Sequence, residues 1–174
     1  MLSTTEQIRT ALASAYPITL LVSPEEDRQE HLLRRFAASA KPNELPVIVW
    51  NCVDGFLGHG AGAHRDPMEA LAWIASEGPQ GLYLLKDLEG IIEDKHLRRG
   101  LRDTAMKIRN TGRFIFLLQQ HAELPDSIKP MTYVVISMFP DESELKSLVT
   151  SLLDGRSPDG PTVDRLIGSL KGMS

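Results

Sequence analysis

The sequence predicts an α/β domain with a largely parallel β-sheet, and three observations lead to this fold class. Short apolar runs alternate with longer helical patterns along the 174 residues, as in a series of βα units. The hydrophobic fraction of 42% and the charged fraction of 24% are typical of a globular protein with a continuous core. The sequence also contains no apolar run near the roughly 18 residues of a membrane span. We therefore expect a globular domain that does not enter a membrane.

The first half of the chain predicts two strands and three helices. Acidic residues at the start of a helix and basic residues later along it complement the helix dipole, and an Asp before a Pro is a common helix start. The expected elements are an amphipathic helix within residues 1–17, a strand at Ile18–Val22, a helix opened by Ser23 and Pro24, a strand at Val47–Trp50, an exposed glycine-rich loop at Asp54–Arg65, and a helix capped by Asp66, with Pro67 at its first position and Glu69 three residues after the cap, which ends at Gly78-Pro79.

The second half predicts three further strands and a basic helix. Strands are expected at Leu82–Leu85, Phe114–Leu118 and Tyr133–Ile136, with a basic helix at Lys95–Arg109, a helix from Asp141 to about Leu153, a hinge at Arg156–Pro161, and a last helix from Thr162. We expect residues 1–155 to form the α/β domain and residues 156–174 to form a linker and the start of a helical appendage. The final Lys171–Ser174 segment gives this helix no convincing ending, so we expect a fragment of a longer protein.

The turn after the first strand is the place where an α/β NTPase holds phosphate. Such a turn is glycine-rich and ends in Gly-Lys-Ser/Thr, because backbone N–H groups, a lysine and a hydroxyl surround the phosphates and magnesium. Here residues 22–28 contain no glycine and no lysine, and Pro24 removes one N–H donor. Glu25, Glu26 and Asp27 lie where phosphates would bind, and like charges at close range repel. The turn therefore predicts an acid-capped helix start.

The glycine-rich segment offers two weaker candidates for a site. Four glycines lie between Gly55 and Gly62, but no Lys-Ser/Thr follows them, so we interpret the segment as a mobile connector and not as a phosphate loop. His59 and His64 supply imidazole nitrogens near Asp54 and Asp66. Their five-residue spacing within a loop is a weak signal for a metal. We expect no metal and no cofactor in this chain.

Two acids follow the third strand, where an NTPase places its magnesium-binding acid and catalytic glutamate. Asp87 and Glu89 have this position, and acids at the carboxyl end of a strand are suited to such work. Acids are common at strand ends, however, and this chain has no phosphate loop to bring the metal. We interpret both residues as vestigial or structural.

The basic helix leaves three interpretations open. Its cations are Lys95, Arg98, Arg99, Arg102, Lys107 and Arg109. They form a solvated helix face, a contact surface for an acidic partner or a neighbouring subunit, or a nucleic-acid surface. The last is disfavoured because no aromatic residues interleave to stack bases, and because the net charge of −4 gives no general attraction to nucleic acid. The single cysteine, Cys52, allows no internal disulfide and suits a reducing cytoplasm.

A series of landmarks, in order, resembles a known family. They are Tyr16-Pro17, Ser23–Arg28, Val49-Trp50 with Asp54-Gly55, Asp66–Leu71, Leu84–Asp87, Arg98–Asp103, Leu124-Pro125 and Phe139–Asp141. The series is similar to the start of an AAA-type ATPase family of cyanobacteria, plastids and other bacteria, whose founding members were described as uncharacterised chloroplast reading frames. Each motif alone is weakly specific, and together they cover nearly the whole chain.

The resemblance implies a three-layer α/β/α sandwich with a parallel five-stranded sheet in the order 5-1-4-3-2. It also implies a degenerate N-terminal ATPase domain followed by a second, active AAA module, to which ATP and magnesium binding would be confined. Lys171–Ser174 resembles the beginning of the family's helical lid region. Gln119 matches the strand end where AAA proteins hold a polar sensor residue, and hydrogen bonding at the sheet edge is its expected role here.

From these features we expect a non-catalytic N-terminal module of a bacterial AAA ATPase. It would position subunits, regulate the active module or recruit a partner, and its partners would be the downstream module, neighbouring subunits and an acidic protein. Two alternatives belong to other classes. One is a small unconventional NTPase that uses Asp87 and Glu89. The other is a stand-alone adaptor whose basic helix docks an acidic protein.

Overall fold

The computed structural model describes residues 2–39, 44–58, 64–88 and 93–137, together with the single positions Leu145, Arg165 and Gly168. The chain divides into two units, Met1–Ile136 and Ser137–Ser174, and the first of them contains the elements described below. Of the helices that the structure describes, none has the length and apolar character needed to cross a membrane. Apart from the three single positions, the elements expected beyond residue 137 lie outside the described residues.

The described strands form one sheet in the order β3-β2-β4-β5-β1-β6. Every neighbouring pair is parallel except β2 and β3. The strands are β1 (Ile18–Val22), β2 (Val47–Asn51), β3 (Gly55–Phe56), β4 (Gly81–Leu85), β5 (Arg113–Gln119) and β6 (Thr132–Ile136). The five expected strands are all present, and their expected order, 5-1-4-3-2, is confirmed. The antiparallel β3 extends the sheet beyond β2.

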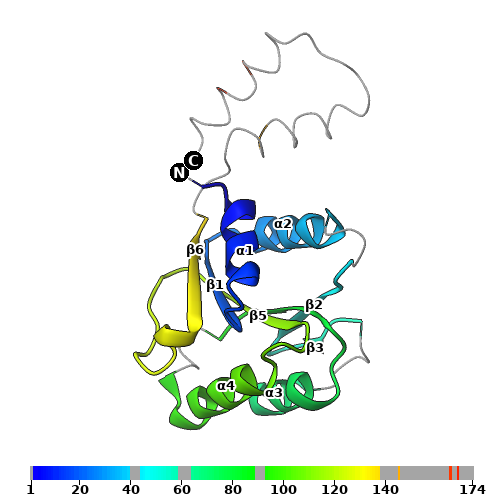
Figure 1. Ribbon diagram of the computed structural model, residues 1–174, viewed down its shortest axis with the longest axis vertical. Helices are drawn as coiled ribbons and strands as arrows, with labels where there is room; N and C mark the ends of the chain where they lie inside the picture. Colours follow the sequence, from blue (N-terminus) through cyan, green and yellow to red (C-terminus); the bar gives the residue numbers. More distant parts are fainter. Residues whose placement is uncertain are drawn as a thin grey trace. The chain divides into compact units, whose positions relative to one another are not determined.

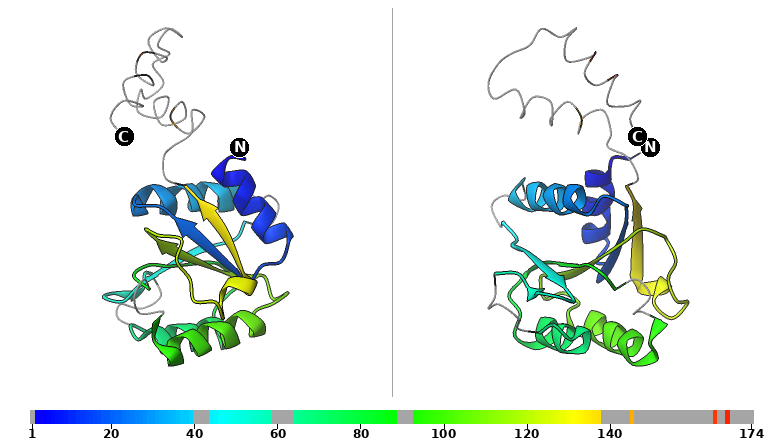
Figure 2. Two further views of the ribbon diagram at one scale, coloured as in Figure 1. Left: turned by 90° about the vertical axis from the view of Figure 1, so that its left-hand side faces the viewer. Right: turned by 180° about the vertical axis from the view of Figure 1, so that it is seen from behind.

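Helices cover both faces of this sheet. Figure 1 shows α1 (Thr4–Ala13) and α2 (Glu26–Ser39) on one face, and α3 (Pro67–Ser76) and α4 (Lys95–Lys107) on the other. The side chains of β1 alternate between the two layers, because Leu20 packs in the core beneath α3 and α4 while Leu21 packs beneath α1 and α2. Four of the five residues of β1 are apolar, as is typical of a strand that is buried on both faces. The three layers are also visible from the two directions of Figure 2.

The start of α3 follows the predicted capping chemistry, and α4 starts with a similar cap that was not predicted. The Asp66 carboxylate accepts hydrogen bonds from the backbone N–H groups of Met68 and Glu69, at 2.8 and 3.1 Å, and α3 begins at Pro67 as expected. Asp94 caps α4 in the same way. Each carboxylate satisfies donors that have no partner within the helix, and it lies at the positive end of the helix dipole.

The expected exposed loop at Asp54–Arg65 is wrong at its beginning. Gly55 and Phe56 are buried and form β3, in which Phe56 pairs with Trp50 of β2. The ring of Phe56 lies 4.6 Å from that of Trp73 in α3. Gly55 has a φ of 73°, a conformation that glycine adopts readily and that a tight hairpin requires. Burial of one aromatic ring therefore orders the start of a segment whose composition is typical of a loop.

Candidate functional site

The carboxyl ends of the parallel strands meet at one edge of the sheet. Residues at the ends of three of these strands form the candidate site. Ser23 follows β1, Lys86 and Asp87 follow β4, and Gln119 ends β5. These strands are neighbours in the order β4-β5-β1. In open α/β sheets ligands bind outside this edge. The fold thus brings together the turn and the strand ends that the sequence singles out.

The turn between β1 and α2 is closed by its own side chains. The Ser23 hydroxyl oxygen accepts hydrogen bonds from the Glu25 N–H and from Nε2 of Gln29, both at 3.2 Å. The Ser23 N–H donates to the Gln119 carbonyl at 2.9 Å. Ser23 is 1% exposed and Gln29 is fully buried. The serine hydroxyl therefore closes the turn ahead of α2, and the Gln29 side chain lies near a helix start that binds phosphate in NTPases.

An ion-pair network joins this helix to the end of β4. Lys86 Nζ lies 2.9 Å from Glu30 Oε2 and 3.8 Å from Glu26 Oε2, and the lysine side chain is only 12% exposed. Glu30 also accepts hydrogen bonds from Arg34, at 3.0 and 2.8 Å. In the turn itself, Arg28 Nε lies 2.7 Å from Glu25 Oε2. Most of the acids in this region are therefore neutralised from within the chain.

The Glu30 carboxyl is held in its charged form. Burial alone would raise its pKa, but the hydrogen bonds from Lys86 and Arg34 outweigh burial, and the pKa lies below its ordinary value. Sequence reasoning did not single out Glu30 as a site residue. The available signal was the spacing of Glu26, Glu30 and Arg34, which places them on one face of the helix, but nothing in the sequence showed which face meets Lys86.

Asp87 is exposed, and its φ of 60° lies in the left-handed region. Aspartate tolerates this conformation better than most residues, although it remains uncommon outside glycine. The following residue, Leu88, is buried in the core beneath α3 and α4. Glu89, the second candidate acid, lies outside the described residues. The structure thus places Asp87 at the sheet edge beside Lys86 and leaves the expected acid pair untested.

Gln119 is 3% exposed, and neither its amide nitrogen nor its amide oxygen has a hydrogen-bond partner within the described residues. In register, it lies beside Val22 of β1. The backbone carbonyl of Gln119 bonds at the sheet edge, but its side chain does not make the hydrogen bond that the sequence predicts there. A buried amide without a partner costs stability.

Replacement of Gln119 by methionine is expected to raise the free energy of unfolding by about 1 kcal/mol, because it removes a buried unsatisfied amide and preserves much of the side-chain volume. Urea denaturation measures the change. Thr104→Val is the control of opposite sign, because the buried Thr104 hydroxyl donates to the Leu71 carbonyl at 3.2 Å and its loss should lower stability. A methionine variant less stable than the parent would show that the amide is satisfied in solution.

His64 contacts two tryptophan side chains and lies in a packed part of the structure. Its imidazole stacks on Trp73 with the ring centres 5.7 Å apart, and its carbonyl accepts a hydrogen bond from Trp50 Nε1 at 2.6 Å. His59, its expected companion, lies outside the described residues. Within residues 2–39, 44–58, 64–88 and 93–137, no three His, Cys, Asp or Glu side chains gather in an arrangement suited to a metal ion.

The cations of the basic helix lie mainly at the surface. Arg99 Nε pairs with Asp103 at 3.0 Å, and Arg98 donates to the Glu93 carbonyl at 3.3 Å. Lys107 and Arg109 are exposed. The helix ends at Lys107, two residues before the expected end. The predicted partner-surface residues therefore lie on α4 or, for Arg109, two residues after its end.

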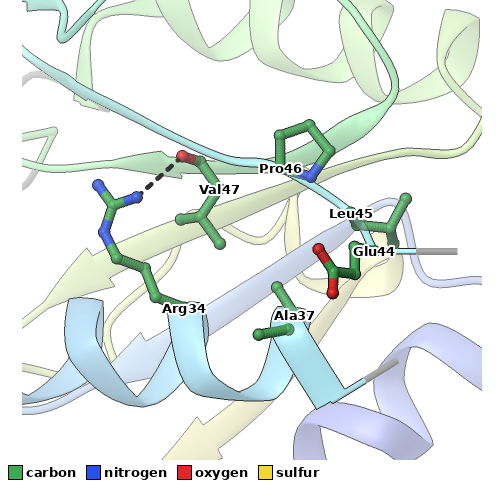
Figure 3. Close-up of a pocket in the computed structure, with 7 residues that line it drawn as sticks. Arg34, Ala37, Glu44, Leu45, Pro46 and Val47 are labelled. Carbon is green, nitrogen blue, oxygen red and sulfur yellow. Dashed lines mark hydrogen bonds between the residues drawn. The ribbon is translucent and has the colours of Figure 1, made fainter. Parts of the chain in front are cut away.

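A shallow pocket of about 330 Å³ lies at the amino end of β2, away from the carboxyl ends of the strands (Figure 3). Its lining comes from the second half of α2 and the segment before β2, namely Arg34, Ala37, Ala38, Glu44, Leu45, Pro46 and Val47. Arg34 Nη1 donates to the Val47 carbonyl at 3.4 Å, the bond drawn in Figure 3. Arg34 also belongs to the ion-pair network around Glu30, but none of the site residues predicted from the sequence lines this pocket.

Comparison with known proteins identifies a family. A sequence model described as "SpoVK-like AAA ATPase, N-terminal domain" matches residues 4–136. The chain is 28% identical, over 85% of its length, to the uncharacterized AAA domain-containing protein ycf46 of Pyropia yezoensis. It is 28% identical, over 82% of its length, to ycf46 of Trieres chinensis. It covers 31% and 29% of those two proteins, and so spans about a third of the length of the curated relatives that it matches.

Two solved structures share the fold. A chain of the Escherichia coli MS115-1 HORMA:CdnC:Trip13 complex matches with a TM-score of 0.55 and 14% identity, over 91% of this chain and 61% of that chain. AMPPCP-bound DnaA from Aquifex aeolicus matches with a TM-score of 0.51 and 15% identity, over 93% of this chain and 54% of that chain. At such low identity these matches establish the arrangement of strands and helices and nothing about activity.

Proposed function

The chain belongs to the family of SpoVK-like AAA ATPase N-terminal domains, and from this premise we propose that it is the non-catalytic module of a longer AAA ATPase. It positions subunits, regulates the active module or recruits a partner, and ATP and magnesium bind in a downstream module. The chain's coverage of only about a third of its curated relatives leaves room for such a module. The exposed single thiol of Cys52 favours a reducing compartment, the cytoplasm.

The observation that carries this proposal is the ion-pair network at the edge of the sheet. In an NTPase, a lysine and the first helical turn neutralise phosphate. Here the ammonium of Lys86 lies 2.9 Å from the Glu30 carboxylate, and the first turn of α2 carries Glu26 and Asp27. A triphosphate at this edge would have to compete for the lysine and approach the two acids. Repulsion between like charges opposes that step.

Titration of the purified chain with Mg-ATP is expected to give no saturable heat at micromolar nucleotide. Thermal unfolding in the presence of Mg-ATP should likewise be unchanged, because a ligand that binds the native state stabilises it by about 2.7 kcal/mol at a hundred times its dissociation constant. Micromolar binding with a matching rise in melting temperature would overturn the proposal. The two measurements check each other, since only specific binding moves both.

The alternative function is a small NTPase with an unconventional phosphate site. One observation favours it. Asp87 has a left-handed backbone conformation at the carboxyl end of β4, and strained backbone is concentrated at functional sites. Phosphate release that persists through purification and falls on Asp87→Asn would support this alternative. Asparagine tolerates the same backbone conformation, so the substitution removes the charge with little effect on the fold.

A further inference from the structure

The outward face of α4 combines positive charge with an exposed methionine. The opposite face of the helix is buried, through Leu97, Leu101, Thr104 and Ala105. Lys95, Arg99, Arg102 and Met106 recur at spacings of four, three and four residues. At 3.6 residues per turn these positions fall in one line along the helix, which we call the basic stripe. Figures 1 and 2 show α4 beside α3 in the helical layer that covers one face of the sheet.

The cations of the basic stripe are only partly satisfied within the chain. Arg99 has one acidic neighbour, Asp103, and is itself 70% exposed. The Nε atom of Arg102 is buried and has no hydrogen-bond partner within the described residues. A carboxylate from outside the chain cannot reach this buried atom and would instead bind the two terminal Nη groups, because the planar guanidinium group of arginine binds carboxylates through two parallel hydrogen bonds.

Met106 adds an apolar contact to this surface. Its side chain is 62% exposed and follows Arg102 by one helical turn. Methionine is flexible and polarisable, and it recurs on surfaces that bind the apolar faces of helices. A partner that fits the basic stripe therefore presents carboxylates one turn apart and an aliphatic side chain one turn further along. An acidic amphipathic helix has this pattern.

We propose that α4 is a docking surface for an acidic helical segment of a protein partner, in which Arg102 receives a carboxylate and Met106 contacts an aliphatic side chain. A nucleic acid fits this surface less well. The basic stripe contains no aromatic side chain to stack on bases. The proposal rests on the partner-recruiting role within the proposed function, and it supplies the chemistry of the partner.

A designed peptide tests this surface directly. The probe is a fluorescein-labelled amphipathic helix with glutamates at positions i, i+4 and i+7 and leucine at position i+11, and fluorescence anisotropy at physiological ionic strength measures its binding to the full chain. We expect saturable binding that Arg102→Glu weakens about tenfold or more, since about 1.4 kcal/mol corresponds to a factor of ten. Met106→Ala should weaken it by a smaller factor.

The control variant is Arg35→Glu, which reverses the charge of an exposed arginine of α2, on the other face of the sheet. It should leave the affinity for the peptide unchanged. Equal binding of a scrambled peptide of the same composition, an unchanged affinity of the Arg102 variant, or no binding at all would overturn the proposal. Tighter binding of a DNA duplex than of the peptide would also overturn it, in favour of a nucleic-acid surface.

The peptide-binding test of α4 and the Mg-ATP test of the non-catalytic role can fail independently of each other. Binding of Mg-ATP at the sheet edge would overturn the proposed function and would leave the peptide affinity unaffected, because α4 contributes none of the residues in the Lys86–Glu30 network. Failure of the peptide to bind would remove the docking surface and would leave the nucleotide result unchanged. Circular dichroism of each variant confirms that the fold is intact.

Discussion

Replacement of Lys86 by methionine is expected to lower the free energy of unfolding by about 2 kcal/mol at pH 7. The substitution keeps the aliphatic length of the side chain and removes the ammonium group that lies 2.9 Å from the Glu30 carboxylate. Hydrogen bonds to charged groups contribute about 1.5–3 kcal/mol, and loss of one partner leaves the other poorly satisfied. Urea denaturation at several pH values measures the change. A loss below about 0.5 kcal/mol, the size typical of an exposed pair, would contradict this account.

The pH dependence of this loss follows from Glu30. The pKa of its carboxyl is lower in the folded chain than in the unfolded chain. Its contribution to stability is therefore complete above the unfolded pKa, and it disappears as the pH falls through the folded pKa. The difference between the parent and Lys86→Met should shrink over the same acid range. A difference that stays constant through that range would show that the methionine acts through packing alone.

A double-mutant cycle isolates the ion pair. Glu30→Gln removes the partner charge, and the variant with both substitutions should be more stable than the sum of the two single losses predicts. Arg34→Met is the matched control for an outer contact of the same carboxylate, because the Arg34 side chain is 48% exposed. Its smaller expected cost follows from the weak net contribution of exposed ion pairs. Equal losses for the two cations would contradict the special role of the lysine.

The central strands were predictable because their signal is strong and local. β1, β4 and β5 are buried on both faces and consist almost entirely of apolar residues, so their positions follow from the sequence within one residue at each end. The Asp66 cap was equally predictable, because an Asp followed by Pro67 and, three residues after the cap, by Glu69 is typical of a helix start. The order of the strands came from the resemblance of the landmarks to a known family. A pattern of apolar runs alone allows several orders of parallel strands.

The features that escaped prediction depend on contacts between distant residues. β3 is only two residues long, and its pairing depends on the burial of Phe56 against α3, which no local pattern reveals. The network around Lys86 joins residues 56 positions apart in sequence, since its partner is Glu30. The acids of the turn suggested repulsion at the phosphate position, whereas the structure neutralises part of that charge with Lys86, which follows β4, two strands away from β1 in the sheet. The position of the turn was predictable from the sequence, but the partial neutralisation of its acids depends on a tertiary contact that the sequence does not show.

Replacement of Gly81 by alanine is expected to cost about 3 kcal/mol of stability. A Cβ atom at this position would lie 2.6 Å from the Pro46 carbonyl oxygen. That oxygen cannot move away freely, because it accepts the Leu82 N–H at 2.9 Å as part of the ladder between β2 and β4. Overpacking that displaces backbone costs about 1–3 kcal/mol and occasionally more. Thermal and urea denaturation measure the loss.

Gly100→Ala in α4 is the matched control for this steric argument. A Cβ atom there would lie 2.7 Å from the sulfur of Met68, a similar overlap, but with the movable part of a flexible side chain. Alanine also favours helix over glycine by about 1 kcal/mol. The Gly100 variant should therefore be close to the parent in stability while the Gly81 variant is not. Similar losses at the two positions would contradict the view that the backbone carbonyl of Pro46 fixes the start of β4, the strand whose other end presents Lys86 to Glu30.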